Sequence, residues 1–389
     1  MRFSGWPVFA ADEIEAVQGV LASGKVNYWT GPHGKAFEQE FAAYHGGGHA
    51  VALANGTLAL EIALRALGIG AGDEVVVPCR TFIATASSVA AVGARPVVAD
   101  VEPASGNVTA AGIEAALTPT TRAVIVVHLG GLPCEMDAIA ALCKARGLKL
   151  IEDCAQAIGA EYRGRKVGTL GDAAAFSFCQ DKIVSTGGEG GMLLLPDEAS
   201  WRRAWSYKDH GKNPDKALKG SGGGGTFVWL HDEFGSNARM TEMQAAIGRL
   251  QLGKLDDWTA RRRANAAVLA GALGDTPGLL ADAIPAYMEH AAYRFYLRVD
   301  EAALNEGWDR DRIVRDVAAG GVPCFQGSCS EIYREAAFEK HGFAPAKRLP
   351  GAMQLDRTSL CLLCHPTLDS EHMQQMADVL NAVMQKATG

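Results

Sequence analysis

The chain has 389 residues, of which 48% are hydrophobic and 21% are charged, a balance typical of a soluble globular protein with room for one large and one smaller domain. Its formal net charge of -7 gives no general electrostatic reason to bind nucleic acid. The N-terminus lacks the layout of a signal peptide, and no apolar run is long enough to span a membrane. We therefore expect a cytoplasmic protein with neither a membrane nor a nucleic-acid partner.

Short apolar runs rich in β-formers alternate with helical patterns through the first half of the chain. The runs lie at residues 50–54, 73–78, 95–100, 122–129, 148–153, 173–178 and 191–196. This alternation predicts an α/β fold, with a mostly parallel seven-stranded sheet covered by helices on both faces.

The second half of the chain has a different pattern. Residues 240–273 predict one long helix with few breakers. Beyond it, a strand is expected at 293–299 and helices at 311–319 and 370–387. We expect a large α/β domain over 1–250 and a small C-terminal α+β domain over 251–389, with the N-terminal helix at 12–24 as a candidate to pack on the small domain. The glycine-rich stretch at 219–226 is predicted to be a mobile loop.

Nine cysteines in a chain of this length do not indicate a disulfide framework, so we expect reduced, buried thiols. Cys361, Cys364 and His365 match the pattern for attachment of a c-type haem, but such a haem needs an exported chain, and Pro366 follows directly. A zinc site would need a second ligand pair at a suitable spacing. We predict no metal site.

Polar residues follow the ends of predicted strands, which is where ligands bind in an open parallel sheet. After the first strand, Asn55, Gly56 and Thr57 open a helix whose first N–H groups could hold a phosphate, although a plain turn with a threonine N-cap fits the same residues. Asp153 ends the fifth strand, and Gln156 follows three residues later. A carboxylate buried there needs a cation or hydrogen-bond donors, unless it is a helix N-cap.

Lys182 lies between an aromatic strand, which ends near Ser177, and the glycine-rich run GGEGG at 187–191. A lysine becomes a nucleophile when desolvation or nearby charge destabilises its ammonium form, and it then forms Schiff bases with aldehydes. A phosphate cradle, a carboxylate for a ring nitrogen and a Schiff-base lysine are together the contacts that pyridoxal phosphate requires.

These residues belong to a longer series of sequence blocks. The blocks are TGP at 30–32, NGTLAL at 55–60, TFIAT at 81–85, EDCAQAIGA at 152–160, GDAAAFSF at 171–178, GGEGG at 187–191, SNARMTEMQAAIGRLQL at 236–252 and HP at 365–366. Their order resembles the DegT/DnrJ/EryC1/StrS family of sugar aminotransferases, which are fold type I enzymes of the aspartate aminotransferase superfamily and depend on pyridoxal phosphate. The resemblance runs from about Trp6 to the C-terminus.

The resemblance implies a role for each matching residue. Lys182 would hold the cofactor as a Schiff base and move the proton between the substrate carbon and the cofactor carbon. Asp153 would keep the pyridine nitrogen protonated. Gln156 would lie against one face of the ring, and Phe82 against the other face or the ring edge.

By the same resemblance, Gly56, Thr57 and Ser177 would bind the phosphate group. Asn237 would reach that phosphate from the second subunit of a homodimer, so that the active sites are shared. Arg239 is a candidate to bind the carboxylate of the amino donor, with a surface ion pair as the alternative.

Other positions near these blocks are less specific. His365 is a candidate substrate contact, with a structural role at a strand end as the alternative. Cys179 and Gln180 depart from the residues common in the family, which marks the approach to Lys182 as a local variation. The carboxylate of Asp181 is expected to point away from Lys182, since an inward carboxylate would favour the protonated lysine.

The function implied by the resemblance is transamination. An amino acid, by similarity L-glutamate, would donate its amino group to a keto group of a nucleotide-linked sugar, and pyridoxamine phosphate would form between the two half reactions. Such reactions serve the biosynthesis of amino sugars for lipopolysaccharide, other glycans or antibiotics. An acceptor without a nucleotide, such as a cyclitol, stays open. Relatives with a histidine at the lysine position remove a hydroxyl group instead, and Lys182 argues against that activity.

Two further classes of protein compete with this prediction. A binding or regulatory protein would retain the fold without the chemistry, but Lys182, Asp153 and the phosphate-binding residues are all present. No additional helix-turn-helix pattern indicates a domain that reads DNA. A nicotinamide dehydrogenase would need a G-x-G-x-x-G run after the first strand, whereas GGEGG follows the sixth.

Overall fold

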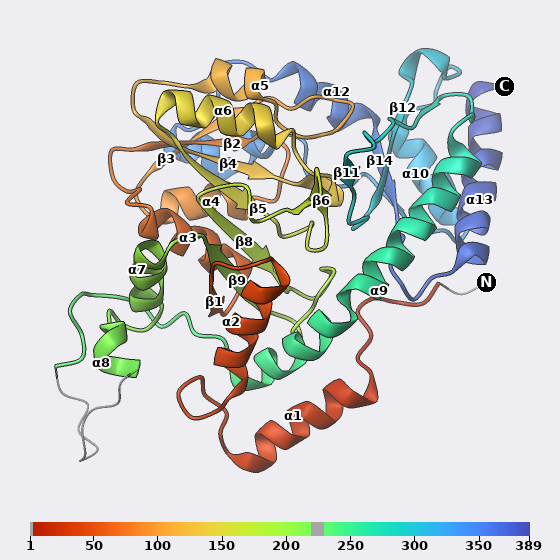
Figure 1. Cartoon of the computed structure of the whole chain (residues 1–389). Helices are drawn as coiled ribbons and strands as arrows, with labels where there is room; N and C mark the ends of the chain where they lie inside the picture. Colours follow the sequence, from red (N-terminus) through yellow and green to blue (C-terminus); the bar gives the residue numbers. More distant parts are fainter. Residues whose placement is uncertain (1–2, 219–228) are drawn as a thin grey trace.

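The computed structural model describes residues 3–218 and 229–389, and within these ranges the chain forms three sheets surrounded by helices (Figure 1). The glycine-rich stretch at 219–226, which is predicted to be mobile, lies outside the described residues. Within the two described ranges, none of the helices combines the length and the apolar character needed to cross a membrane.

The seven strands predicted from the apolar runs are all present and form one sheet in the order β1-β9-β8-β5-β4-β2-β3. Their bounds are β1 His49–Leu53, β2 Glu74–Pro78, β3 Arg95–Ala99, β4 Thr121–Val127, β5 Lys149–Asp153, β8 Ala173–Ser177 and β9 Gly191–Leu195. Strand β9 is antiparallel to both of its neighbours, whereas the other pairs are parallel. The predicted mostly parallel sheet is therefore confirmed.

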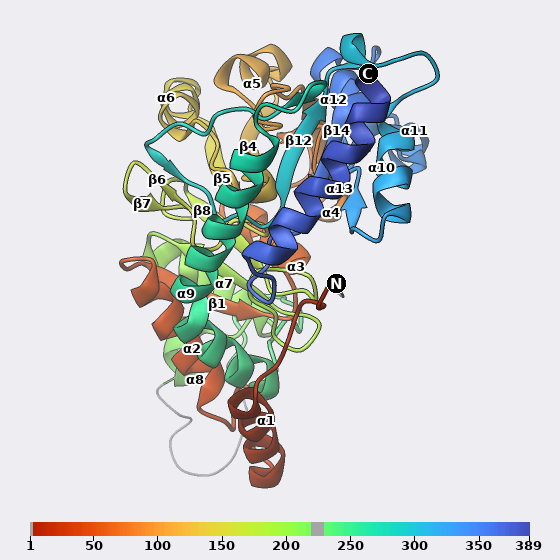
Figure 2. The ribbon, with the colours of Figure 1, turned by 90° about the vertical axis from the view of Figure 1, so that its right-hand side faces the viewer.

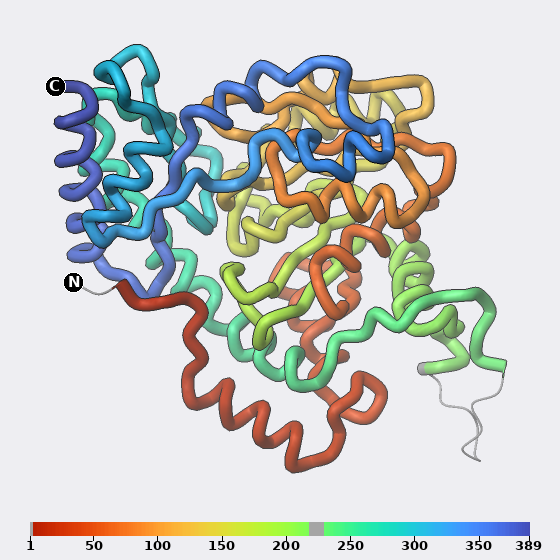
Figure 3. Tube along the Cα trace, turned by 180° about the vertical axis from the view of Figure 1, so that it is seen from behind, coloured from red at the N-terminus to blue at the C-terminus, as the bar shows by residue number. Residues whose placement is uncertain are grey.

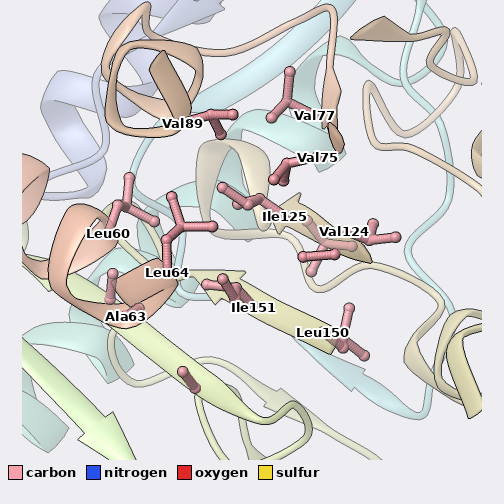
Figure 4. Packing of buried hydrophobic residues seen from close by; sticks show 14 of the residues in the cluster. Leu60, Ala63, Leu64, Val75, Val77, Val89, Val124, Ile125, Leu150 and Ile151 are labelled. Carbon is pink, nitrogen blue, oxygen red and sulfur yellow. The ribbon is translucent and has the colours of Figure 1, made fainter. Parts of the chain in front are cut away.

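Helices cover both faces of this sheet. They are α2 His33–Tyr44, α3 Gly56–Ala66, α4 Ala84–Ala91, α5 Ala110–Ala116, α6 Met136–Arg146 and α7 Glu198–Lys208. The short helix η1 Leu129–Gly131 follows β4, and α8 Pro214–Leu218 packs on α7. On one face, Leu60 of α3 and Val89 of α4 pack in one cluster with Val75 of β2 (Figure 4). On the other face, the ring of Phe41 in α2 packs edge-on against Phe176 of β8. Burial on both faces explains why the strands are continuous apolar runs in the sequence.

A four-stranded sheet, in the order β10-β12-β14-β13, forms the centre of a second unit, and a small third sheet has the order β11-β6-β7. The strand bounds are β6 Glu161–Tyr162, β7 Arg165–Lys166, β10 Leu279–Leu280, β11 Met288–Glu289, β12 Phe295–Val299, β13 Cys324–Phe325 and β14 Ser359–Leu362. The helix bounds are η2 Glu301–Ala303, α10 Arg310–Ala319, η3 Ile332–Arg334, α11 Ala336–His341, α12 Pro350–Thr358 and α13 Ser370–Thr388. Strand β12 and helices α10 and α13 match the predicted elements of this unit.

Helix α9 (Glu242–Leu273) matches the predicted long helix, and it runs along both units (Figure 2). The first half of α9 packs against α1 (Ala11–Ser23), where Lys254 pairs with Asp12 at 2.8 Å. Helix α9 also packs against α13. The boundary expected between residues 250 and 251 falls inside this helix. Helix α1 itself lies along α9, whereas the segment before it starts beside the second unit, where Phe3 packs against that unit's hydrophobic cluster (Figure 3).

The strand directions bring the polar strand ends together. Strands β5, β8 and β2 point the same way because they belong to the parallel part of the sheet, and β1 shares their direction because both β1 and β8 are antiparallel to β9. The residues that end or follow these strands therefore lie at one edge of the sheet, among them Asn55, Thr81, Asp153 and Ser177.

Candidate active site

A cavity of about 500 Å³ opens at this edge, and both units contribute to its walls. Residues that follow the sheet strands line one side, including Phe82, Gln156 and Lys182. Tyr293 and Arg294, which lie just before β12, line the other side. The cavity volume is within the usual range for small-molecule sites.

Lys182 reaches into this cavity from the loop after β8, and its side chain is 17% exposed. The backbone of the loop is held on both sides of the lysine: its N–H donates to the carbonyl of Cys179 at 3.1 Å, and its carbonyl accepts from the indole N–H of Trp6 at 2.7 Å. The ammonium nitrogen lies 5.0 Å from the centre of the Tyr293 ring. The lysine is thus held in a partly desolvated position, as a Schiff-base lysine requires.

The carboxylate of Asp181 points toward Lys182, so the expectation that it points away is wrong. Its Oδ1 lies 3.7 Å from Lys182 Nζ. The hydroxyl of Tyr293 donates to Oδ2, and the guanidinium of Arg294 lies 3.8 Å from the same oxygen. Burial raises the pKa of Asp181, but these three neighbours outweigh burial and hold the pKa below its ordinary value. The two residues from the second unit draw this carboxylate inward, and neither is close to it in sequence.

Asp153 ends β5 and is 6% exposed. The hydroxyl of Thr85 donates to Oδ2 at 3.0 Å and the N–H of Ala155 donates to Oδ1 at 3.1 Å. Burial raises the pKa of Asp153, although both donors and Lys182 act in the opposite direction. A turn follows β5 in this described stretch, so Asp153 is not the N-cap of a helix. Asp153 lies behind the residues that line the cavity and is not itself one of them. A buried carboxylate whose hydrogen-bond donors are neutral fits a cationic ring nitrogen.

The start of α3 meets the end of β8. The side chain of Asn55 caps the helix by accepting from the N–H of Leu58 at 2.9 Å, so the cap is Asn55 and Thr57 lies exposed in the first turn. A Cβ on Gly56 would lie 2.7 Å from Cβ of Ser177, which means that only glycine allows this close approach. Gly56, Thr57 and Ser177 therefore share one site at a helix N-terminus, and this arrangement suits a phosphate group.

Gln156 and Phe82 lie on the walls of the cavity. Gln156 is buried, and its Oε1 accepts from the N–H of Gly130 at 2.7 Å, which orients the side chain. Phe82 is 71% exposed and lines the cavity from the segment after β2. Their roles beside the cofactor ring remain predictions, and their positions allow them.

Two residues of the SNARM block are candidate site residues: Arg239 pairs with Leu53 at the end of β1, and Asn237 pairs with Asp209. Neither lines the cavity of the single chain. Asn237 is exposed. Arg239 donates from Nη1 to Oδ1 of the buried Asp209 at 2.6 Å, and its side chain is 14% exposed. This geometry favours the ion-pair interpretation of Arg239 over recognition of the amino donor.

His365 lies away from the cavity and is buried. Its Nδ1 is 2.8 Å from the hydroxyl of Thr367, and its ring stacks on Trp6 with 6.2 Å between the centres. Burial lowers the pKa of His365 to about 3, and Arg262 and Arg294 lower it further. These contacts favour the structural interpretation of this histidine.

One cluster of metal-ligand types, which we did not predict, lies beneath the sheet edge at His128, Glu152 and Cys154. Nε2 of His128 is 3.1 Å from Glu152, and its Nδ1 accepts from the N–H of Cys134 at 3.0 Å. The Glu152 carboxylate also accepts three backbone N–H groups, from Gly168, Leu170 and Gly171. Since both ring nitrogens and the carboxylate are engaged, the cluster is a structural hydrogen-bond network rather than a metal centre.

Sequence comparison decides the family. A family model described as the DegT/DnrJ/EryC1/StrS aminotransferase family matches residues 7–381. The chain belongs to this family. Among solved structures, it is similar to an aminotransferase from Psychrobacter cryohalolentis, with 48% identity, a TM-score of 0.97 and coverage of 100% of both chains.

Two curated relatives are named after different compounds. The chain is 35% identical over 373 residues to the dTDP-3-amino-3,4,6-trideoxy-alpha-D-glucose transaminase of Streptomyces venezuelae, covering 95% of this chain and 91% of the relative. It is 40% identical over 314 residues to the L-glutamine:2-deoxy-scyllo-inosose aminotransferase of Micromonospora echinospora, covering 77% of this chain and 72% of the relative.

The protein is therefore an aminotransferase, and its cofactor is pyridoxal phosphate. The residues at the sheet edge fit that group. Lys182 lines the cavity, and the buried carboxylate of Asp153 requires a cationic partner. The close approach of Gly56 to Ser177 places the N-terminus of α3 where it can bind the phosphate. Thr85, Tyr293 and Arg294 are the contacts that sequence reasoning missed. Thr85 could have been predicted as a site residue, since it lies in the TFIAT block.

Proposed function

We propose that the protein transfers an amino group from an amino acid, with L-glutamate as the expected donor, to a keto group of a nucleotide-linked sugar. The observation that carries the transamination chemistry is the meeting of Lys182, Asp153 and the start of α3 at one sheet edge. The nucleotide-sugar acceptor is supported by the similarity to the dTDP-sugar transaminase, which extends over 95% of the chain.

Each residue at the site has a part in the proposed reaction. Bound pyridoxal phosphate supplies the carbonyl that takes up amino groups and a ring that accepts electrons. Lys182 holds the cofactor covalently between turnovers, and its free amine moves the proton between carbon atoms during each half reaction. Asp153 keeps the ring nitrogen protonated. Gly56, Thr57 and Ser177 bind the phosphate and fix the orientation of the ring.

The mouth of the cavity suits a substrate larger than an amino acid. Phe325, from β13 of the second unit, is 48% exposed and lines the cavity, as does the more exposed Phe82. Exposed aromatic rings offer stacking surfaces for sugar and base planes. We assign the nucleotide to this outer part of the cavity and the keto sugar to the inner part near Lys182.

The acceptor is tested by comparing three keto substrates with the purified enzyme and glutamate: a nucleotide-linked keto sugar, the same sugar without the nucleotide, and 2-deoxy-scyllo-inosose. We expect kcat/KM for the nucleotide-linked sugar to exceed the other two by at least about 100-fold, because contacts to the remote nucleotide contribute to transition-state binding. The second candidate function is amination of a cyclitol, which the similarity to the inosose aminotransferase favours. A preference for the inosose would replace our proposal with that function.

We also propose that the active enzyme is a cytoplasmic homodimer with shared sites. The cytoplasmic location is supported by the nine cysteines, all of which are free thiols, eight of them buried or partly buried. The dimer is supported by the family resemblance at Asn237, which is exposed in the single chain and has no role in its cavity. In the proposed dimer, its amide donates to the phosphate bound at the other subunit's α3.

Asn237→Ala is expected to weaken the affinity for pyridoxal phosphate by about 10- to 100-fold, because one hydrogen bond to a charged group is lost. Equilibrium dialysis of the cofactor measures this change. Mixing refolded Asn237→Ala and Lys182→Ala chains should then restore activity, since each mixed dimer contains one intact site if Asn237 serves the partner subunit. An Asn237→Ala chain with unchanged affinity, or a mixture without recovered activity, would contradict the shared site.

A further inference from the structure

A second cavity lies between the two units, separate from the catalytic one. Its volume is about 410 Å³, which is large enough for a small organic ligand. Its walls are the loop after β3, the second half of α9, the loop after β10, and β12. Among the described residues, Tyr296 of β12 is the one that lines both cavities.

Arg80 lines this second cavity and is 2% exposed. Within the described ranges, its one hydrogen bond runs from Nη2 to the hydroxyl of Ser359 at 2.6 Å, and its buried Nε has no partner. The guanidinium lies 5.1 Å from the centre of the Tyr296 ring. A buried cation normally has an acidic partner, because removing it from water is costly.

The other charged groups of the cavity do not supply that partner. Asp282 is the acidic residue on the wall, and it is engaged with Arg298 through two contacts, at 2.9 Å from Nε and 2.7 Å from Nη2. His290 accepts the N–H of Ala292 at Nδ1, and burial lowers its pKa to about 4, so it adds no second charge near neutral pH. Arg80 is therefore the cation on this wall that lacks an acid in the described structure.

The remaining walls are mostly apolar. The large apolar side chains among the lining residues are Leu129, Leu132, Ile284, Phe295, Leu297 and Leu355. A phosphate ion would find one guanidinium and few other donors among these side chains. A carboxylate pairs with an arginine through charge-assisted hydrogen bonds, and an apolar body attached to it would cover the aliphatic and aromatic walls.

We propose that this inter-domain cavity is a second ligand site, which binds a small organic carboxylate through Arg80 and holds the apolar body of that ligand against β12 and α12. The site differs from the catalytic cavity, because Tyr296 is the one described lining residue that the two cavities share and Lys182 does not line the second one. The proposal does not depend on which acceptor the enzyme aminates.

The test is a titration of the enzyme, loaded with pyridoxal phosphate, with 4-fluorobenzoate followed by fluorine NMR. We expect saturable binding with a Kd of about 1 mM or tighter, and at least tenfold weaker binding of the neutral 4-fluorobenzyl alcohol, since the charge-assisted pair with Arg80 is lost. Arg80→Met should weaken 4-fluorobenzoate binding by at least about tenfold. Methionine is apolar and of similar length, so the variant is expected to fold.

A second variant protects the test against failure of Arg80→Met to fold. Ala283 is exposed and lines the cavity, so Ala283→Trp should narrow the site, weaken probe binding and leave transamination unchanged. Absence of saturable binding to the wild-type enzyme, equal binding of the alcohol, or unchanged binding to Ala283→Trp and Arg80→Met would overturn the proposal. The last result would place the probe in the catalytic cavity.

Discussion

Lys182→Ala is expected to lower the rate of transamination by at least about 10⁴-fold, because a methyl group can neither hold the cofactor covalently nor carry the proton between carbon atoms. The fold should survive. The lost ion pair to Asp181 spans 3.7 Å in a partly exposed position, and such a pair contributes about 0–1 kcal/mol. Asp181 keeps the hydroxyl of Tyr293 as a donor. Initial rates measure the loss of activity, and the melting temperature measures whether the fold survives. The yellow absorption of lysine-bound cofactor shows whether the covalent bond to the cofactor still forms.

The matched control is Lys166→Ala. The ammonium of Lys166 lies 3.2 Å from Glu161 Oε1 and 4.3 Å from the centre of the Tyr44 ring, so it also sits between a carboxylate and a tyrosine. Lys166 does not line the catalytic cavity, and we expect its variant to retain the wild-type rate and absorption. The assignment of Lys182 fails if its variant turns over at a comparable rate, or if the absorption of lysine-bound cofactor persists without it.

The large sheet could be predicted from the sequence because each of its strands is buried on both faces and therefore forms a continuous apolar run. The same reasoning misses β6, β7 and β11, which have two residues each and are too short to show any period. Sequence reasoning also does not locate the boundary between the two units, since α9 belongs to both. The length of that helix was visible in the sequence, but its packing partners, α1 and α13, were not.

At the site, the residues that follow strands were predictable, because parallel strands bring their carboxyl ends to one edge. Contacts from the second unit were not. Tyr293 and Arg294 are more than a hundred residues from Asp181 in sequence, and their positions decide the direction of its carboxylate. Arg239 shows the same limit, because its ion pair with Asp209 joins residues that no local pattern connects.

Asp153→Asn is expected to lower kcat by about 10²- to 10³-fold, because it removes a preorganised charge that holds the ring nitrogen protonated. The variant should keep the local structure. The asparagine oxygen can still accept the N–H of Ala155, and its amide can donate to Thr85, whose hydroxyl also bonds to that of Thr81 at 2.8 Å. The control is Asp137→Asn, an exposed carboxylate on α6 that pairs with Arg163, and this variant should leave kcat unchanged.

The stability of the Asp153→Asn variant separates an electrostatic role from a packing role. Burial raises the pKa of Asp153 in the cofactor-free protein above its ordinary value of 3.8, so its contribution to stability is fully present below that value and is lost as pH rises through the folded pKa. The cofactor-free variant should therefore melt with the wild type at acid pH and above it at neutral pH. Pyridoxal phosphate should reverse this order at neutral pH, since its protonated nitrogen can pair with the aspartate alone. If melting temperatures show the same order with and without cofactor, Asp153 does not face the ring nitrogen.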